Sequence, residues 1–206
     1  GYVDKLLWDN ELITTYFQRN SQLLATYKGN NSGTDLESEL RSHTDYDYSR
    51  TSTISDIAMP ATPGINKRYY YFNQSHSATY NQVFRVGKNG ELGINAAYLN
   101  DRDERSNQSV TTTLLPDGSK NVVDESFNGI LHRNIANGNI TYMQNTERNY
   151  IKEQLKFDWL STDGYSNIYA GEDIIQENNV ENYRLHNLFH LTSRTGSDKG
   201  VEFLSK

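Results

Sequence analysis

Apolar and polar residues alternate with a period of two along most of this chain, and short polar turns separate the alternating segments. Such alternation is typical of a β-strand with one apolar and one polar face, because successive side chains point to opposite sides of a sheet. One segment carries Leu155, Phe157 and Trp159 on one side and Lys156 and Asp158 on the other. The recurrence of this pattern predicts an all-β protein, an antiparallel meander of consecutive hairpins.

The alternating segments predict roughly ten to twelve strands. This estimate comes from thirteen candidate segments, residues 11–17, 22–28, 67–74, 78–86, 91–100, 111–115, 121–124, 129–134, 139–145, 150–160, 165–170, 183–192 and 201–204. Gly, Pro, Asn and Asp mark turns between them, because these residues adopt turn conformations most easily. The expected turns are 18–21, 87–90, 116–119, 162–164 and 196–198. In the turn at 87–90 we expect the Asn-Gly pair to supply the residues with positive φ.

Regular alternation is lost over residues 29–67, which begin with a Gly-Asn-Asn-Ser-Gly run and include two prolines near their end. We expect one long loop here. Thr34 and Glu37 have the spacing of a helix capping box, which predicts a short helix from Thr34 or Asp35 to about Arg41. Because loops carry recognition while strands carry the frame, substrate contacts should come from this loop and from inward-facing polar residues.

The composition agrees with an all-β protein and argues against several other classes of protein. Only 35% of the residues are hydrophobic, yet 15 Tyr and 7 Phe argue against disorder. Transmembrane barrels have this profile because half of each strand faces water, and a soluble β-sandwich fits it as well. The net charge is -6 without a Lys/Arg cluster, so nucleic acid is not an expected partner. No Cys is present, and no run approaches the ~18 apolar residues of a membrane helix.

Two apolar rows end in an aromatic residue, as a lipid-facing strand requires, because Tyr and Trp favour the headgroup boundary. One row lies in segment 91–100 and the other in segment 150–160. The same rows would also serve as the inner face of a β-sandwich. The residues predicted to face lipid are Leu92, Ile94, Tyr98, Leu155, Phe157 and Trp159.

Three stretches resemble barrel segments of TonB-dependent-receptor-like outer-membrane proteins of the Bacteroidetes: YKGNNSGTD at 27–35, YLND at 98–101 with the charges that follow it, and 139–164. The resemblance rests on strand-and-turn phrases and covers most of the chain. It implies one partial-barrel domain over residues 1–206, from soon after the plug. A barrel of about 22 strands needs far more than 206 residues, so we expect the plug and the closing strands to lie outside this chain.

The resemblance implies that the intact parent sits in the cell outer membrane and takes up a nutrient with energy from the TonB system, acting through the absent plug. The implied partners are outer-membrane lipid, an unidentified nutrient and a surface lipoprotein. The chain stops at 201–206 without a terminating turn, which we interpret as an artificial boundary. Alone in water, such a segment is expected to self-associate or to collapse into sandwich-like packing.

Enzymatic activity and cofactors are not expected, because the sequence has no Gly-rich phosphate cradle, nucleophile elbow or His-Glu-x-x-His pattern. The alternative to a barrel is a soluble, secreted β-sandwich or glycan-binding module. Strand length separates the two, since membrane strands need ~9–11 residues whereas strands of other proteins average ~5–6. A hydrolase on a β-scaffold would need convergent polar residues, which the sequence does not single out.

Three groups of residues are candidate binding sites. His186 and His190 lie four apart on one strand face, about 13 Å apart at ~3.3 Å per residue, which is too far for one metal ion. In the long loop, carboxylates and aromatic rings alternate in a manner suited to gripping a sugar or a peptide, although an ordinary polar loop is the simpler interpretation. These candidate ligand contacts are Asp45, Tyr46, Asp47 and Tyr48.

The third group is a run of alternating charges that follows the strand at 91–100. Ca²⁺ prefers several oxygen ligands, but interleaved arginines would compensate the carboxylates instead. We therefore predict a solvated extension of the hairpin. The run consists of Asp101, Arg102, Asp103, Glu104 and Arg105.

Overall fold

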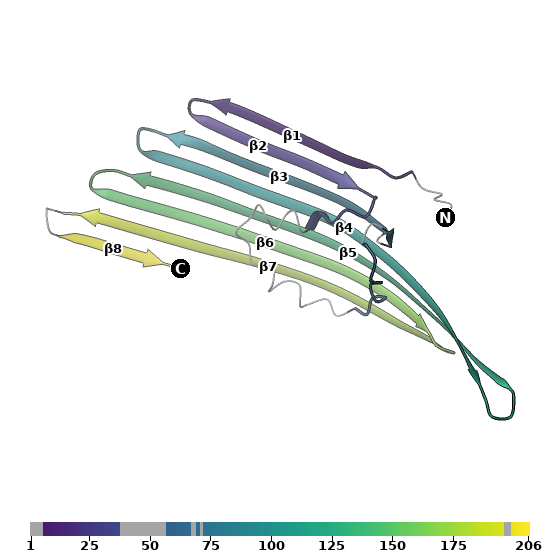
Figure 1. The fold of residues 1–206 in the computed structure, drawn as a ribbon. Coiled ribbons are helices and arrows are strands. Elements are labelled where there is room, and N and C mark those ends of the chain that lie inside the picture. The colour runs from purple at the N-terminus through teal and green to yellow at the C-terminus, as the bar shows by residue number, and fades with distance from the viewer. Residues whose placement is uncertain (1–5, 38–56, 67–68, 71, 196–198) are drawn as a thin grey trace.

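A computed structural model of the chain describes residues 6–37, 57–66, 69–70, 72–195 and 199–206. These residues form one antiparallel sheet of eight strands whose order in space is their order in the sequence. Figure 1 shows the strands lying side by side in a single curved layer, with β1 at one edge and β8 at the other. The predicted all-β meander is therefore confirmed, and the sheet is open rather than closed into a barrel.

The strands are long. They are β1 (Asp9–Gln18), β2 (Ser21–Asn30), β3 (Phe72–Val86), β4 (Gly90–Leu114), β5 (Lys120–Asn145), β6 (Asn149–Tyr169), β7 (Asp173–Arg194) and β8 (Gly200–Ser205). All of these except β8 have at least 10 residues, and β5 has 26. The prediction of more numerous and shorter strands is wrong for the described residues, because several predicted strands are parts of one strand.

The expected turn at 162–164 shows why the sequence suggested too many strands. Its Thr-Asp-Gly triplet lies inside β6 and pairs in full register with β5 and β7. Gly164 is there because the side chain of Ile57 lies above it: an added Cβ would come within 2.8 Å of Cδ1 of Ile57. A glycine that makes room for a neighbour was thus mistaken for a glycine that makes a turn.

The turns at 18–21, 87–90 and 116–119 are confirmed as hairpin connections. The Asn-Gly pair of the second turn does not supply positive φ, contrary to expectation. Gly87 does so, with φ of 66°, and Gly118 at the tip of the β4–β5 hairpin has φ of 83°. Both are glycines because a Cβ is disfavoured in this region of φ.

One end of the sheet carries only short connections, whereas the other end carries the long β2–β3 connection and the projecting tip of the β4–β5 hairpin (Figure 1). The short turns are staggered along the strand direction. Paired residues can be followed across the sheet from Ser21, the first residue of β2, to Ser205 of β8. Because Ser205 comes five residues after the first residue of β8, the turn before β8 is displaced by five residues relative to the turn before β2. The strands are therefore inclined to the line that joins their turns.

The register divides the strand residues between two faces, because residues paired directly across neighbouring strands point to the same side. We call one the apolar face. It carries Leu12, Tyr16, Leu23, Tyr27, Tyr80, Phe84, Leu92, Ile94, Tyr98, Ile140, Tyr142, Leu155, Phe157, Trp159, Tyr183, Leu185, Phe189, Leu191 and Phe203. All six residues predicted to face lipid lie on this face.

The opposite side is the polar face. It carries Glu11, Thr26, Lys28, Thr79, Asn81, Asn95, Asn137, Asn139, Thr141, Lys152, Gln154, Lys156, Asp158, Arg184, His186 and His190. Nothing resembling a second sheet covers either face among the described residues, which form one layer. The described residues therefore show a single sheet rather than two sheets packed face to face.

Candidate functional site

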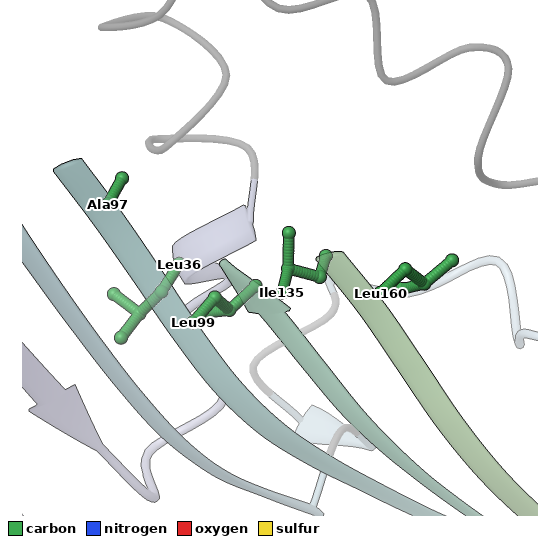
Figure 2. Close-up of a cluster of buried hydrophobic side chains, with 5 residues drawn as sticks. All are labelled: Leu36, Ala97, Leu99, Ile135 and Leu160. Carbon is green, nitrogen blue, oxygen red and sulfur yellow. The ribbon is translucent and has the colours of Figure 1, made fainter. Parts of the chain in front are cut away.

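The β2–β3 connection lies against the polar face. We call its described residues 31–37 and 57–60 the strap. Leu36 of the strap is 3% exposed and belongs to a small buried cluster with side chains from three strands. Figure 2 shows the sheet members of this cluster, Ala97, Leu99, Ile135 and Leu160, on β4, β5 and β6. The main buried core of the described chain is thus the contact between strap and sheet.

Two glycines of the sheet accommodate the second part of the strap. Gly164 of β6 lies beneath Ile57, as described above. A Cβ on Gly129 of β5 would lie 2.6 Å from Sδ of Met59 and 3.1 Å from Cδ of Pro60. Any larger side chain at either glycine would push the strap away from the sheet. The backbone NH of Ala58 also donates to Oε1 of Gln176 on β7, at 3.2 Å.

A buried network of amides holds the first part of the strap. Asn30, at the end of β2, is fully buried, and its Oδ1 accepts hydrogen bonds from the backbone NH of Thr34 and from Nδ2 of Asn73. Oδ1 of Asn73 in turn accepts from the backbone NH of Gly33 at 2.9 Å. Because buried polar groups cost stability unless they are hydrogen-bonded, this network fixes the direction in which the chain leaves β2.

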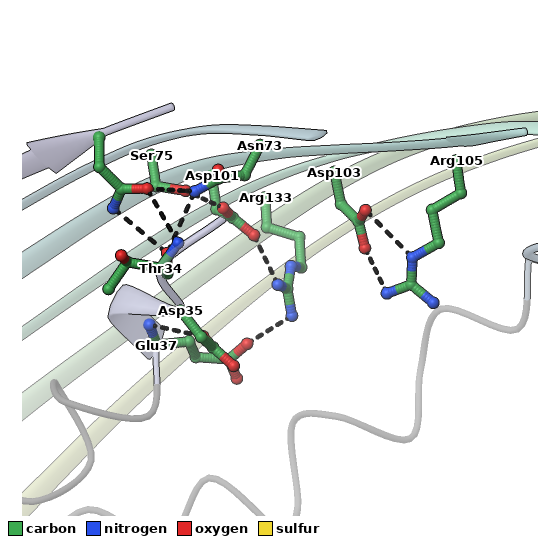
Figure 3. Close-up of polar contacts among 10 residues, drawn as sticks. Thr34, Asp35, Glu37, Asn73, Ser75, Asp101, Asp103, Arg105 and Arg133 are labelled. Carbon is green, nitrogen blue, oxygen red and sulfur yellow. Dashed lines mark hydrogen bonds and ion pairs between the residues drawn. The ribbon is translucent and has the colours of Figure 1, made fainter. Parts of the chain in front are cut away.

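The network continues into an ionic clamp (Figure 3). Nδ2 of Asn73 donates to Oγ of Ser75, and Ser75 donates to Oδ1 of Asp101. Arg133 of β5 then joins sheet and strap: its Nη2 lies 2.6 Å from Oδ2 of Asp101, and its Nη1 lies 2.6 Å from Oε2 of Glu37. One guanidinium thus bridges a carboxylate of the sheet and a carboxylate of the strap.

The predicted solvated extension at 101–105 is wrong for three of its five residues, Asp101, Asp103 and Arg105. Asp101 and Asp103 are 4% and 3% exposed, and Arg105 binds Asp103 through both Nε and Nη2. Only Arg102 and Glu104, which the register places on the opposite face, remain exposed. The reason is the strap, which covers the polar face at this level and turns alternate charges into buried ones.

Polar tips of aromatic side chains mark one border of the apolar face. Toward the long connections, the hydroxyl of Tyr98 donates to Oδ1 of Asn134 at 2.9 Å, and Nε1 of Trp159 donates to Oε1 of Glu181 at 3.0 Å. The Tyr183 hydroxyl bonds to the same carboxylate. The hydroxyl of Tyr27 lies 2.8 Å from Nδ1 of His76. In each pair the partner lies one row farther toward the long connections than the aromatic residue.

Toward the short turns, the tips point the other way. The hydroxyl of Tyr16 donates to Oε1 of Gln18 at 3.1 Å, and that of Tyr142 donates to Oε1 of Gln144 at 3.4 Å. Tyr80 bonds to Gln82 in the same direction, but it lies within the apolar face, one row from the level of Tyr27 and Tyr98. The aromatic residues at the two borders therefore direct their polar atoms away from the middle of the apolar face.

His186 and His190 both lie on the polar face of β7, where they pair with Lys156 and Lys152. Nε2 of His190 lies 2.9 Å from Oε1 of Glu202 on β8, so this histidine has a carboxylate partner from the next strand. Among the residues that the structure describes, no group of three His, Asp or Glu side chains converges in a manner that could hold a metal ion.

Other predicted features fall partly or wholly outside the described residues. Asp45, Tyr46, Asp47 and Tyr48 do so entirely, as does most of the expected short helix. At its start, the carboxylate of Asp35 accepts from the backbone NH of Glu37 at 3.1 Å. The capping interaction seen in the described part is therefore made by Asp35, two residues before Glu37, rather than by the hydroxyl of Thr34.

Comparison with known proteins adds no identification: no protein-family model and no curated protein sequence matches this chain. Within the described residues, no helix is long and apolar enough to cross a membrane. The amide-network residues Asn30 and Asn73 and the clamp residue Arg133 were not singled out from the sequence. In the sequence, these residues are only a polar residue at each end of the loop and an arginine within a strand. Their contacts with one another can be recognised only once the strand register is known.

Proposed function

We propose that this chain is a segment of an outer-membrane β-barrel receptor or transporter, and that the intact parent performs TonB-dependent nutrient uptake. The observation that carries the proposal is the apolar face with its outward-directed aromatic tips at both borders. Tyr and Trp adopt this orientation at the two interfaces of a membrane, where the ring meets the acyl region and the polar tip meets water. A soluble protein has no reason to orient them in opposite directions at opposite borders of one exposed face.

The dimensions of the apolar face support this proposal. On β5 the polar partners of the two borders are Asn134 and Gln144, and the ten residue steps from one to the other span about 33 Å at ~3.3 Å per residue. The stagger of the short turns, about 16 Å over six strand spacings of ~4.8 Å, corresponds to a tilt of about 30°. The height between the borders is then about 29 Å, close to the ~25–30 Å apolar thickness of a bilayer.

The exposed side chains of the apolar face also have to be shielded from water by lipid or by another protein layer. Tyr183 is 63% exposed and Leu185 is 70% exposed, and the face continues across all eight strands. Soluble monomers rarely expose contiguous apolar patches larger than a few hundred Å². Lipid supplies such a cover without any second protein layer, whereas the alternative of a soluble β-sandwich would need a second sheet.

The topology supports a barrel wall with its polar face turned inward. Outer-membrane barrels have short turns at one end and long connections at the other, as this sheet has. The strap would then lie inside the lumen, where loops and inward polar side chains contact the solute. Energy coupling through a plug and contact with a surface lipoprotein belong to the intact parent in this proposal.

Fractionation of cells that make the full-length protein tests its localisation. We expect recovery in the outer membrane as a band whose mobility on a gel changes on heating. Recovery as a soluble protein with no larger precursor would overturn the proposal and favour the secreted glycan-binding module.

Site-directed spin labelling tests which face meets lipid, and these 206 residues contribute no Cys that would compete with an introduced one. In the intact protein in lipid, labels at Leu155 and Phe157 should be accessible to oxygen, which concentrates in the bilayer. Labels at Gln154 and Lys156 should instead be accessible to a water-soluble nickel chelate. Equal accessibility at all four positions would contradict the assignment of the two faces.

A further inference from the structure

Basic side chains gather on the polar face of β6 and β7. Lys156 pairs with His186, and Lys152 pairs with His190 two rows away toward the short turns. The neutral pair Gln154–Leu188 occupies the one row between these two pairs, and Arg184 lies one row beyond Lys156. We call residues 152–158 of β6 and 184–190 of β7, on their polar face, the basic strip.

The charge of the basic strip is opposite to that of the chain. Its fixed charges are the cations Lys152, Lys156 and Arg184 and the carboxylate of Asp158, which leaves a net charge of +2 with both histidines neutral. The whole chain carries -6. Like charges on one sheet face repel each other, so an accumulation of cations costs stability unless something else requires it.

The cations of the strip also lack the ion-pair partners that four other basic residues of the sheet have. Lys28, Arg102, Arg105 and Arg133 each form an ion pair with a carboxylate. By contrast, none of the three fixed cations of the strip forms an ion pair with any carboxylate of the described chain. Asp158, which lies opposite Arg184, offsets part of the charge of Arg184 and Lys156 without forming an ion pair, and the remaining net charge of +2 is available to a ligand.

The surroundings of the strip suit the rest of a polar solute. Amide side chains of β5, β6 and β7 flank the cations, among them Asn139, Gln154 and Asn182. A hollow of about 10 Å³, at the lower limit for holding one water, is lined by Asn137, Asp158, Asn182 and Arg184 together with apolar neighbours. Two of those neighbours, Ile135 and Leu160, belong to the cluster beneath Leu36. The strip therefore begins where the strap contact ends.

We propose that the basic strip binds the anionic groups of a small, hydroxyl-rich solute, with a carboxylate, sulfate or phosphate against Lys152, Lys156 and Arg184. Hydrogen bonds between charged groups are stronger than those between neutral groups, and a guanidinium can bind an oxyanion through two donors. The flanking amides would bind the hydroxyls. This inference rests on the proposed function, because a solute would reach the strip through the lumen.

The experiment measures pyrophosphate binding to the purified full-length protein in detergent by calorimetry, with trehalose as a neutral comparison. A double variant, K152Q with K156Q, is compared with K88Q with K120Q, which removes the same charge at a turn and at a hairpin tip. We expect the first pair to weaken pyrophosphate binding about tenfold and the second to leave it unchanged. Asp158→Asn should strengthen binding, because it removes the carboxylate within the strip, while Glu202, which contacts His190 from β8, is left in place.

Equal effects of the two double variants, or no change with Asp158→Asn, would overturn the inference. So would a native protein that binds trehalose as well as pyrophosphate. Heat-modifiability of each variant shows that its barrel has assembled, which separates lost binding from lost folding. Failure of the proposed function is seen independently, as a soluble native protein in the fractionation, whatever the calorimetry gives.

Discussion

Replacement of Arg133 by Leu tests the ionic clamp between strap and sheet. The variant keeps most of the side-chain volume but leaves Asp101, whose side chain is 5% exposed, without its guanidinium partner. Breaking a buried ion pair by removing one partner costs about 3–5 kcal/mol. Arg133 itself is 23% exposed, so solvent compensates part of this loss, and we expect about 2–4 kcal/mol.

The loss should appear as local opening of the strap, because Glu37 attaches the strap to Arg133 through an ion pair. Hydrogen exchange read by mass spectrometry measures this opening through the amides of Gly33 and Thr34, whose protection depends on Asn73 and Asn30. At 1.4 kcal/mol per factor of ten, exchange there should accelerate roughly 30- to 1000-fold. Peptides from β7 should exchange as in the native protein.

Arg102→Leu provides the matched control. Arg102 follows Asp101 in the sequence but lies on the other face, where its partner Glu104 is exposed. Its effect should stay within about 0.5 kcal/mol. Asp101→Asn in the Arg133→Leu background should restore part of the protection, since it removes the uncompensated charge. Equal exchange in the two arginine variants, or no recovery in the double variant, would refute the clamp.

Four further outcomes are expected. Gly164→Ala should loosen the strap by about 1–3 kcal/mol in hydrogen exchange, whereas Gly138→Ala, with its nearest neighbouring atom 3.9 Å away, should not. Leu155→Arg should lower barrel stability in lipid by about 2–4 kcal/mol in urea titrations, and unchanged stability would argue against lipid contact. The isolated segment should self-associate in sedimentation, and a stable monomer would contradict this. Hydrogen bonds from Ser119 hold the pKa of Asp117 below its ordinary value. The ionised carboxylate therefore stabilises the hairpin tip at pH values above the unfolded-state pKa, and this stabilisation is lost as the pH falls through the folded-state pKa. Ser119→Ala should raise the pKa of Asp117, as measured by carboxyl NMR.

The two-faced sheet could be predicted from the sequence because its cause is local. Side-chain direction in a strand alternates whatever the rest of the chain does, so Leu92 and Ile94 must share a face. The hairpin at 116–119 was predictable for the same reason, since Pro, Asp and Gly determine the turn within four residues. The six residues predicted to face lipid were placed on one face without any knowledge of the register.

The strap contact could not be predicted, because its cause is a set of contacts distant in sequence. Arg133 and Glu37 are 96 residues apart, and Asn30 and Asn73 are 43 apart. Nothing near Asp101 in the sequence distinguishes a buried carboxylate from an exposed one. The burial of Asp101 and Asp103 follows from where the strap lies, and that depends on Leu36 meeting its cluster on three different strands.

The change of pattern along β4 places the strap and the basic strip at different depths. Up to Tyr98, one side of the strand is apolar, whereas from Asn100 onward both sides carry polar or charged residues. The proposed membrane border thus falls at Tyr98, and the strap clamp at Asp101 lies just beyond it, at the mouth. The basic strip lies deeper, since Lys156 is flanked in sequence by Leu155 and Phe157 of the apolar face. A solute entering from the long-connection end would meet the strap before the cations, so releasing the clamp should change access to the strip without changing its affinity.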